Sequence, residues 1–147
     1  MRQEIRNIYE INEHPNQEVC FEWMRNNWHD LGQHIVEEMI LSLKALADYT
    51  GGKLDYSIGI TPDRGEFVKI TDYDPDLLKE ISNTMDDCPL TGVCYDYAAI
   101  KGLKNGDLEE EVLTTLHNEG EYIYSDDGLL ELAQANKYEF YATGQAI

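Results

Sequence analysis

The chain has 147 residues, and 29 acidic side chains against 11 basic ones give it a formal net charge of −18. A hydrophobic fraction of 42% with ten tyrosines excludes a disordered acidic tail, because this many apolar side chains can form a core. Acidic residues exceed basic ones in every third of the chain, which argues against direct binding to nucleic acid or an anionic membrane. We expect one compact domain, residues 1–147, that needs no disulfide or metal.

The cysteines and the apolar segments bear on the compartment. The three cysteines are an odd number without a CxxC pair, which argues against a disulfide framework and favours a reducing compartment. No signal peptide is recognised after Met1, and no segment approaches the length of about 18 apolar residues that a membrane span needs. We therefore expect a soluble, cytoplasmic protein.

The first third of the chain is expected to contain a strand, Ile5–Ile11, followed by two helices. The first helix starts near Asn16 and breaks at Asn26-Asn27. The second starts near Asp30 and stops before Gly51-Gly52, because glycine favours the left-handed turn that ends a helix. Apolar residues recur along this second helix at intervals of three and four, which is typical of one buried face. They are Leu31, Ile35, Met39, Leu43 and Leu46.

A β-hairpin is expected next. Lys53–Ile60 alternates apolar and polar residues, and Glu66–Thr71 forms the second strand. Thr61–Gly65 lies between them and contains the proline, aspartate and glycine that are typical of a turn. Asp74 followed by Pro75 then predicts the N-cap and the first position of a third helix.

The last third is expected to contain three more helices and a closing strand. Tyr95–Leu103 forms one helix, Asp107 caps another over Leu108–His117, and Ser125-Asp126-Asp127 caps a short one. Lys137–Tyr141 alternates as a strand. Because the elements lack a regular βαβ rhythm, the sequence favours the α+β class, with a small, mainly antiparallel sheet packed by several helices.

Three alternating aspartates resemble the start of a calcium loop. They are Asp72, Asp74 and Asp76, and counting from the first, the sixth and twelfth positions hold Leu77 and Asn83. An EF-hand loop needs glycine and glutamate at those two positions. We therefore expect these aspartates to surround a helix N-terminus, where the helix dipole favours acids.

The histidines and cysteines lack the spacing of a zinc site. His29 and His34 are five residues apart and share no helix face, and Cys88 and Cys94 have no close third ligand. Cys20 is expected to be a packed core thiol. No P-loop, dinucleotide-binding or hydrolase signature is present, so no cofactor is expected and an enzyme is not favoured.

Aromatic residues cluster late in the chain. We expect them to pack in the core and against the sheet, and the alternative is a contact surface, since tyrosine is enriched at interfaces. The cluster consists of Tyr95, Tyr97, Tyr122, Tyr124, Tyr138, Phe140 and Tyr141.

Three segments carry a resemblance to known proteins. The opening Ile8-Tyr9-Glu10-Ile11, the helix with Trp23 and the ending Ala135–Phe140 occur in an order that resembles a group of small acidic proteins of bacteriophages and mobile elements. The resemblance implies an inhibitor of host defence, including restriction and CRISPR machinery, in the cytoplasm of a host cell. It transfers no site residues.

The charge and the absent motifs favour a non-enzymatic protein that occupies a basic, nucleic-acid-binding surface of another protein. B-DNA carries one phosphate charge per about 1.7 Å, so about 22 charges span the roughly 38 Å expected for a globule of this length. Mimicry of DNA would need the acids to gather on one ridge, and otherwise each acidic cluster is a solvated face. The candidate partner-binding residues are Asp72, Asp74, Asp76, Asp86, Asp87, Glu109, Glu110, Glu111, Glu119, Glu121, Asp126 and Asp127.

Two alternatives stay open at this point. One is an antitoxin or regulatory partner that binds a basic protein through the aromatic cluster. The other is a small hydrolase that uses two carboxylates held in one cleft. A homodimer is compatible with all three functions.

Overall fold

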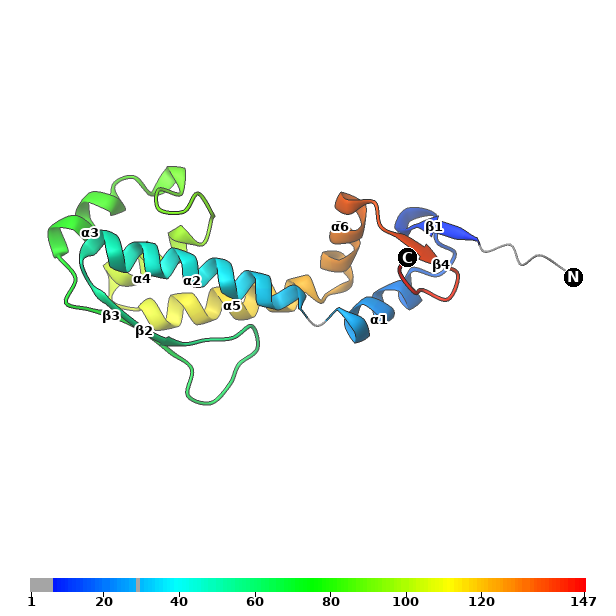
Figure 1. Cartoon of the computed structure of the whole chain (residues 1–147), viewed down its shortest axis with the longest axis horizontal. Helices are drawn as coiled ribbons and strands as arrows, with labels where there is room; N and C mark the ends of the chain where they lie inside the picture. The colour runs from blue at the N-terminus through cyan, green and yellow to red at the C-terminus, as the bar shows by residue number, and fades with distance from the viewer. Residues whose placement is uncertain (1–6, 29) are drawn as a thin grey trace, which may run out of the picture. The chain divides into compact units, whose positions relative to one another are not determined.

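The computed structural model describes residues 7–28 and 30–147, which group into two compact units. Of the described residues, unit 1 combines 7–28, 30–31 and 121–147, and unit 2 consists of 32–120 (Figure 1). The described residues form six α-helices and two separate two-stranded antiparallel sheets, one in each unit. The predicted α+β class is therefore confirmed, while the folding of residues 1–147 as one domain stays a prediction.

Unit 1 is built from the two ends of the chain. Strand β1 (Ile8–Glu10) pairs antiparallel with β4 (Glu139–Tyr141), so that Ile8 lies opposite Tyr141. The helices of this unit are the 3-10 helix η1 (Ile11–Glu13), α1 (Gln17–Asn27) and α6 (Asp126–Asn136). The observed strand is thus shorter than the predicted Ile5–Ile11, because Ile11 already belongs to η1. Ile5 lies outside the described residues.

The core of unit 1 is apolar and includes the predicted core thiol. Cys20, Met24, Leu129 and Phe140 are each 0% exposed and pack in one cluster. Burial of one such large side chain contributes about 1.5–3 kcal/mol relative to exposure. The predicted interior position of Cys20 is confirmed.

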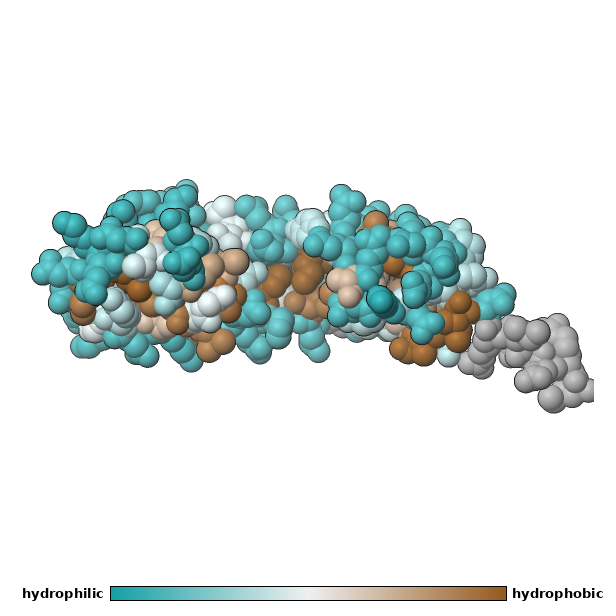
Figure 2. Space-filling view, turned by 90° about the horizontal axis from the view of Figure 1, so that it is seen from above, coloured by the Kyte–Doolittle hydropathy of each residue, from teal (hydrophilic) through white to brown (hydrophobic). Residues whose placement is uncertain are grey.

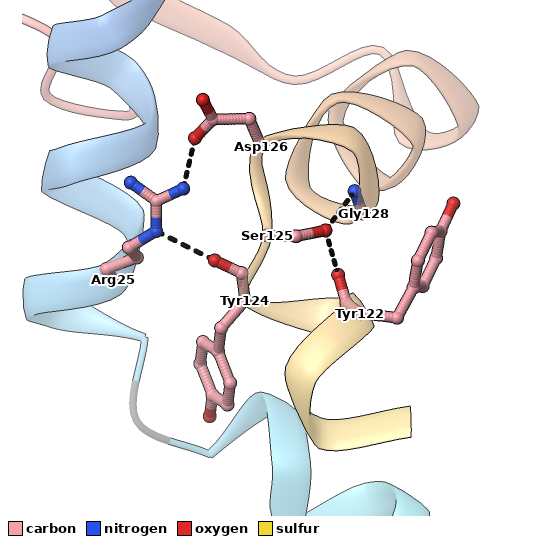
Figure 3. Close-up of polar contacts among 6 residues, drawn as sticks. All are labelled: Arg25, Tyr122, Tyr124, Ser125, Asp126 and Gly128. Atoms are coloured by element: carbon pink, nitrogen blue, oxygen red, sulfur yellow. Dashed lines mark hydrogen bonds and ion pairs between the residues drawn. The ribbon is translucent and has the colours of Figure 1, made fainter. Parts of the chain in front are cut away.

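Arg25 fastens α1 to the start of α6 within this unit (Figure 3). Its Nε donates to the Tyr124 carbonyl at 2.7 Å, and its guanidinium forms an ion pair with Asp126. Ser125 caps α6, since its Oγ accepts from the Gly128 amide at 3.1 Å, as its position in the sequence predicts. Asp126 is therefore engaged inside unit 1.

Unit 2 contains the remaining elements. They are α2 (Leu31–Thr50), β2 (Lys53–Ser57), β3 (Phe67–Thr71), α3 (Pro75–Ser82), the 3-10 helix η2 (Met85–Asp87), α4 (Asp96–Asn105) and α5 (Leu108–Ile123). The boundary between the units falls inside two of these helices, because the first residue of α2 and the last three residues of α5 belong to unit 1. The predicted hairpin is confirmed, with Lys53 opposite Thr71 and Ser57 opposite Phe67 (Figure 1). Asp74 caps α3 as predicted, because its Oδ1 accepts from the Asp76 amide at 2.9 Å.

The hairpin loop 58–66 is longer than predicted because its residues pack against helices instead of extending the strands. Ile60 lies against Gly32 of α2 and Gly120 of α5, and a Cβ on these glycines would come within 2.8 Å and 2.7 Å of Ile60 Cγ1. These contacts also explain why α5 continues past His117, where the sequence predicted its end. Gly120 serves a close approach inside the helix and does not stop it.

A buried glutamate organises the same loop. The Glu66 side chain is only 7% exposed, and it accepts hydrogen bonds from the backbone amides of Gly59 and Asp63. His117 of α5 places Nε2 at 3.4 Å from Glu66 Oε1. This separation does not meet hydrogen-bond geometry, and it is an ion pair only when the imidazole is protonated, so the packing of Ile60 is the main contact between the loop and α5.

Candidate functional site

A cavity of about 510 Å³ lies in unit 2 where β3, the end of α4 and the start of α5 meet. Its apolar lining consists of buried residues, which are Val68, Ile70, Leu103 and Leu108. Its polar lining consists of Lys69, Tyr73, Asp107, Glu109 and Glu110. The cavity thus combines an apolar wall with one ammonium group and three carboxylates.

The sequence around residues 102–110 explains why the acids gather there. Gly106 has a φ of 78° and ends α4 in the left-handed conformation that glycine favours. Gly102 permits a close approach, because a Cβ on it would lie 2.8 Å from Leu108 Cα. Helix α5 therefore begins directly against α4, and its first turn carries Glu109 and Glu110, where the helix dipole stabilises negative charge.

Asp107 differs from an ordinary N-cap. Its carbonyl oxygen accepts from the Glu111 amide at 2.9 Å, and the carboxylate Oδ1 is buried without a hydrogen-bond partner among the described residues. A buried acceptor without a donor costs about 1–3 kcal/mol.

The charge of the cavity is negative. Lys69 is the cation of the lining, and its Nζ lies 3.8 Å from Asp55 Oδ2, a carboxylate outside the lining. Lys69 is therefore shared with another acid, and Asp107, Glu109 and Glu110 outnumber it. Such a lining favours a cationic ligand over an anionic one.

The predicted partner-binding residues are divided between the two units. Nine of them lie in unit 2, whereas Glu121, Asp126 and Asp127 lie in unit 1. Within unit 2 two of the predicted residues, Glu109 and Glu110, line the cavity. Tyr73 also lines it, whereas the neighbouring Asp72, Asp74 and Asp76 do not belong to the lining.

Ion pairs neutralise two of the predicted residues in unit 2. Lys53 Nζ lies 3.5 Å from Asp72 Oδ2, and Lys101 Nζ lies 3.6 Å from Glu111 Oε1. The others in this unit are exposed at the surface, namely Asp74, Asp76, Asp86, Asp87, Glu109, Glu110 and Glu119. The remaining negative charge is thus concentrated in residues that face solvent.

Sequence reasoning missed part of the cavity. Asp107 was expected only as a helix cap, and neither Lys69 nor Tyr73 was expected at a site. The signal available for Asp107 was its place between a helix-ending glycine and a run of three glutamates. No local signal exists for Lys69, since its approach to α5 depends on how β3 packs.

The aromatic cluster is partly accounted for by core packing. Phe140 is fully buried, and Tyr138 packs edge-on against Trp28 with ring centroids 5.2 Å apart. Burial raises the pKa of the Tyr95 phenol to about 12, with smaller contributions from the charges of Glu119 and Glu38. Tyr122 is 47% exposed, so the cluster does not form one continuous contact surface with Phe140.

Two further findings bear on the kind of site. In the described part of the chain, no group of three or more histidine, cysteine, aspartate or glutamate side chains is placed to hold a metal ion. The same part contains no helix long and apolar enough to cross a membrane.

Comparisons of the chain with family models, with curated proteins and with solved structures find no match.

Proposed function

We propose that the chain is a non-enzymatic acidic binding protein whose unit 2 binds a basic protein surface and receives a lysine or arginine side chain in the acidic cavity. The observation that carries this proposal is the convergence of Asp107, Glu109 and Glu110 on a cavity with an apolar wall. A basic side chain suits both parts, because its methylene stem is apolar and its head is cationic.

The size and chemistry of the cavity support this fit. A volume of about 510 Å³ falls within the range of roughly 300–1,000 Å³ that is usual for ligand pockets. Charge-assisted hydrogen bonds to carboxylates are about twice as strong as neutral ones. The carboxylates of the lining, which belong to Asp107, Glu109 and Glu110, are the candidate acceptors for such bonds.

The charge of unit 2 supports a basic partner. This unit contains 18 acidic against 7 basic residues. An acidic field of this kind steers basic surfaces toward the protein and raises association rates at low salt. Figure 2 shows that hydrophilic residues dominate the face drawn, while apolar residues gather in smaller groups between them.

The proposed partner is a nucleic-acid-binding channel of a host defence complex, of the restriction or CRISPR type, in the cytoplasm. Such channels are lined with lysine and arginine that neutralise phosphates. A carboxylate surface that occupies the channel excludes nucleic acid by competition. The chain would then act as an inhibitor.

A competition assay tests the proposal. Labelled duplex DNA is bound to a purified CRISPR or restriction effector, and its release by the chain is followed by fluorescence anisotropy between about 50 and 500 mM salt. We expect release that weakens with salt, because screening reduces charge-led binding. Release that is independent of salt, or no release from any effector, contradicts the proposal.

A matched pair of variants locates the contact. Glu109→Gln with Glu110→Gln removes two charges from the cavity, and Glu37→Gln with Asp48→Asn removes two exposed charges elsewhere in unit 2. We expect at least about tenfold weaker inhibition by the first variant, since loss of a charged contact costs about 1.5–3 kcal/mol. An equal loss of inhibition in both variants would show that the acids of the cavity do not contact the partner.

A carboxylate hydrolase is the second candidate, and the same convergence of three acids favours it. It would bind a substrate, not a protein side chain, in the cavity. Turnover of chromogenic glycosides that is lost on Asp107→Asn would establish this alternative and would exclude a purely binding role.

A further inference from the structure

The acidic cavity runs along one edge of strand β3. Its lining includes three consecutive residues of this strand, Val68, Lys69 and Ile70. Val68 and Ile70 are buried and Lys69 is exposed, because neighbouring side chains of a strand point to opposite faces. A cavity that contacts residues of both faces passes the edge of the strand. No residue of β2 lines it in the described part of the chain, so this edge of β3 faces away from β2.

This edge of β3 has no partner strand among the described residues. β3 pairs with β2 on its other side, and in an antiparallel pair every second residue turns its N–H and C=O away from the partner. Within the described ranges, no backbone hydrogen bond joins residues 67–71 to a segment other than β2. The edge along the cavity therefore presents amides and carbonyls with which a further strand can pair.

The rest of the lining decides which side chains such a strand would carry. Val68 and Ile70 share the apolar wall with Leu103 and Leu108, and the three carboxylates of the lining lie beside this wall at the start of α5. Every second side chain of an added strand would point to this face. A lysine or arginine there would place its methylene stem on the apolar wall and its charged head among the carboxylates.

We propose that unit 2 binds an extended segment of a basic protein by strand addition to the open edge of β3, with lysine or arginine at every second position of that segment. This inference rests on the proposed function, because it specifies how the acidic cavity receives its basic side chain. Main-chain hydrogen bonds supply affinity in this mode of recognition, and alternate side chains supply specificity. At about 3.3 Å per residue, the three lining residues of β3 span about 10 Å, the length of about three residues of the partner.

Charge favours a basic partner over a second copy of this chain. Pairing of β3 between two copies would bring together two units that each contain 18 acidic against 7 basic residues, and these would repel each other. A lysine within an edge strand also opposes the pairing of identical strands. The Lys69 ammonium lies 3.8 Å from Asp55 Oδ2, so its repulsion of a basic segment is reduced.

Peptides with a modified main chain test the strand addition. The probe is an acetylated and amidated nonapeptide in which arginine alternates with threonine, and isothermal titration calorimetry measures its binding to the full chain. Two further peptides carry N-methyl groups, one on its arginines and the other on its threonines. An added strand turns only one of these two sets of amides toward β3, so we expect one methylated peptide to bind at least about tenfold more weakly than the other.

Two results of this titration would overturn the proposal. One is that both methylated peptides bind as tightly as the unmodified probe, since the main chain is then not recognised. The other is that the unmodified probe does not bind at about 1 mM in low salt. The same nonapeptide with glutamate in place of arginine is the charge control, and we expect it not to bind.

Amide hydrogen exchange in β3, followed by NMR, provides a readout on the chain itself. In the free chain, the amides of β3 that pair with β2 exchange slowly, and those that face the cavity exchange fast. Saturation with the probe is expected to slow the second group at least about tenfold. Unchanged exchange of these amides would mean that the peptide binds through its side chains alone, which would overturn strand addition.

Variants of the chain connect the peptide to the cavity. Glu109→Gln with Glu110→Gln is expected to weaken binding of the probe at least about tenfold, whereas Glu37→Gln with Asp48→Asn should leave it within about twofold. Equal weakening by both pairs would place the peptide elsewhere and would overturn the proposal.

The effector competition assay keeps this inference apart from the proposed function. Release of DNA by a chain whose β3 amides gain no protection from the probe would overturn strand addition alone. Protection of these amides without release of DNA from any effector would support strand addition and contradict the host defence partner alone.

Discussion

At the scale of single residues, the surroundings of a carboxylate decide what it does. Asp74 caps a helix, Asp107 has a buried oxygen without a hydrogen-bond partner among the described residues, and Asp96 is fully buried with three donors. All three have the same side chain. A chain with 29 acids therefore contains structural acids that must be separated from those available to a partner.

Asp96→Ala is expected to destabilise the protein by about 3 kcal/mol, because it removes a fully buried acceptor from the amides of Leu90 and Thr91 and from the Thr91 hydroxyl. Asp96→Asn is expected to cost less, since its carbonyl oxygen can still accept from both amides. Urea unfolding measures both changes, and Asp87→Asn, an exposed neutralisation nearby, is the control. Equal costs for the alanine and asparagine variants would contradict this account.

Tyr95 is expected to make stability fall at high pH. Its folded-state pKa of about 12 lies above the ordinary value of 10.0, so the unfolded chain ionises first and stability is lost as the pH rises from about 10 to about 12. Tyr95→Phe removes this loss and should gain stability relative to the unaltered chain over that range. Urea unfolding at several pH values measures the difference in the free energy of unfolding between Tyr95→Phe and the unaltered chain. A difference that stays constant from about pH 10 to about pH 12 would show that folding does not raise the pKa of the phenol.

At the scale of elements, glycines allow backbones to approach where the hairpin loop meets the helices of unit 2. At Gly32 an added Cβ would meet only side-chain atoms of Ile60. At Gly120 it would also come within 2.9 Å of the Ile60 backbone oxygen. The two glycines therefore differ in whether a smaller residue at position 60 can relieve the contact.

Gly32→Ala is expected to destabilise the protein by about 1–3 kcal/mol through overpacking, partly offset by the better helix propensity of alanine. Combined with Ile60→Ala, its cost should fall, with a coupling energy of about 1 kcal/mol or more in a double-mutant cycle. The same cycle with Gly120→Ala should give weaker coupling, because the backbone contact remains. Identical coupling for both glycines would argue against this geometry.

At the scale of the whole molecule, the net charge of −18 opposes folding through self-repulsion. The described ion pairs between acids and lysine or arginine involve Arg25, Lys53, Lys69 and Lys101. Four such pairs leave most of the 29 acids uncompensated. Surface pairs of this kind contribute only about 0–1 kcal/mol each, so they do not remove the repulsion.

Added salt is therefore expected to stabilise the chain. Raising NaCl from about 20 to about 300 mM shortens the Debye length from roughly 20 Å to below 8 Å and screens the repulsion. The melting temperature, followed by circular dichroism, should rise by several degrees, and KCl should act equally because the effect is not ion-specific. A melting temperature that falls or stays constant would mean that attractive pairs dominate.

Local interactions determined the features that the sequence predicted. The apolar spacing of Leu31–Leu46 predicts helix α2, and Ser125 and Asp74 are found as the caps that their positions indicate. The hairpin follows from alternation and a turn segment. Each of these signals depends on residues within a few positions of one another, so the sequence by itself contains them.

Only the tertiary structure decided which distant segments meet. Lys69 and Glu110 are some forty positions apart, yet both line one cavity, and Ile60 reaches Gly120 inside a helix that the sequence ended too early. The division of the acids between two units likewise depends on packing. Such contacts result from burial of apolar surface summed over many residues, and no local pattern encodes which faces come together.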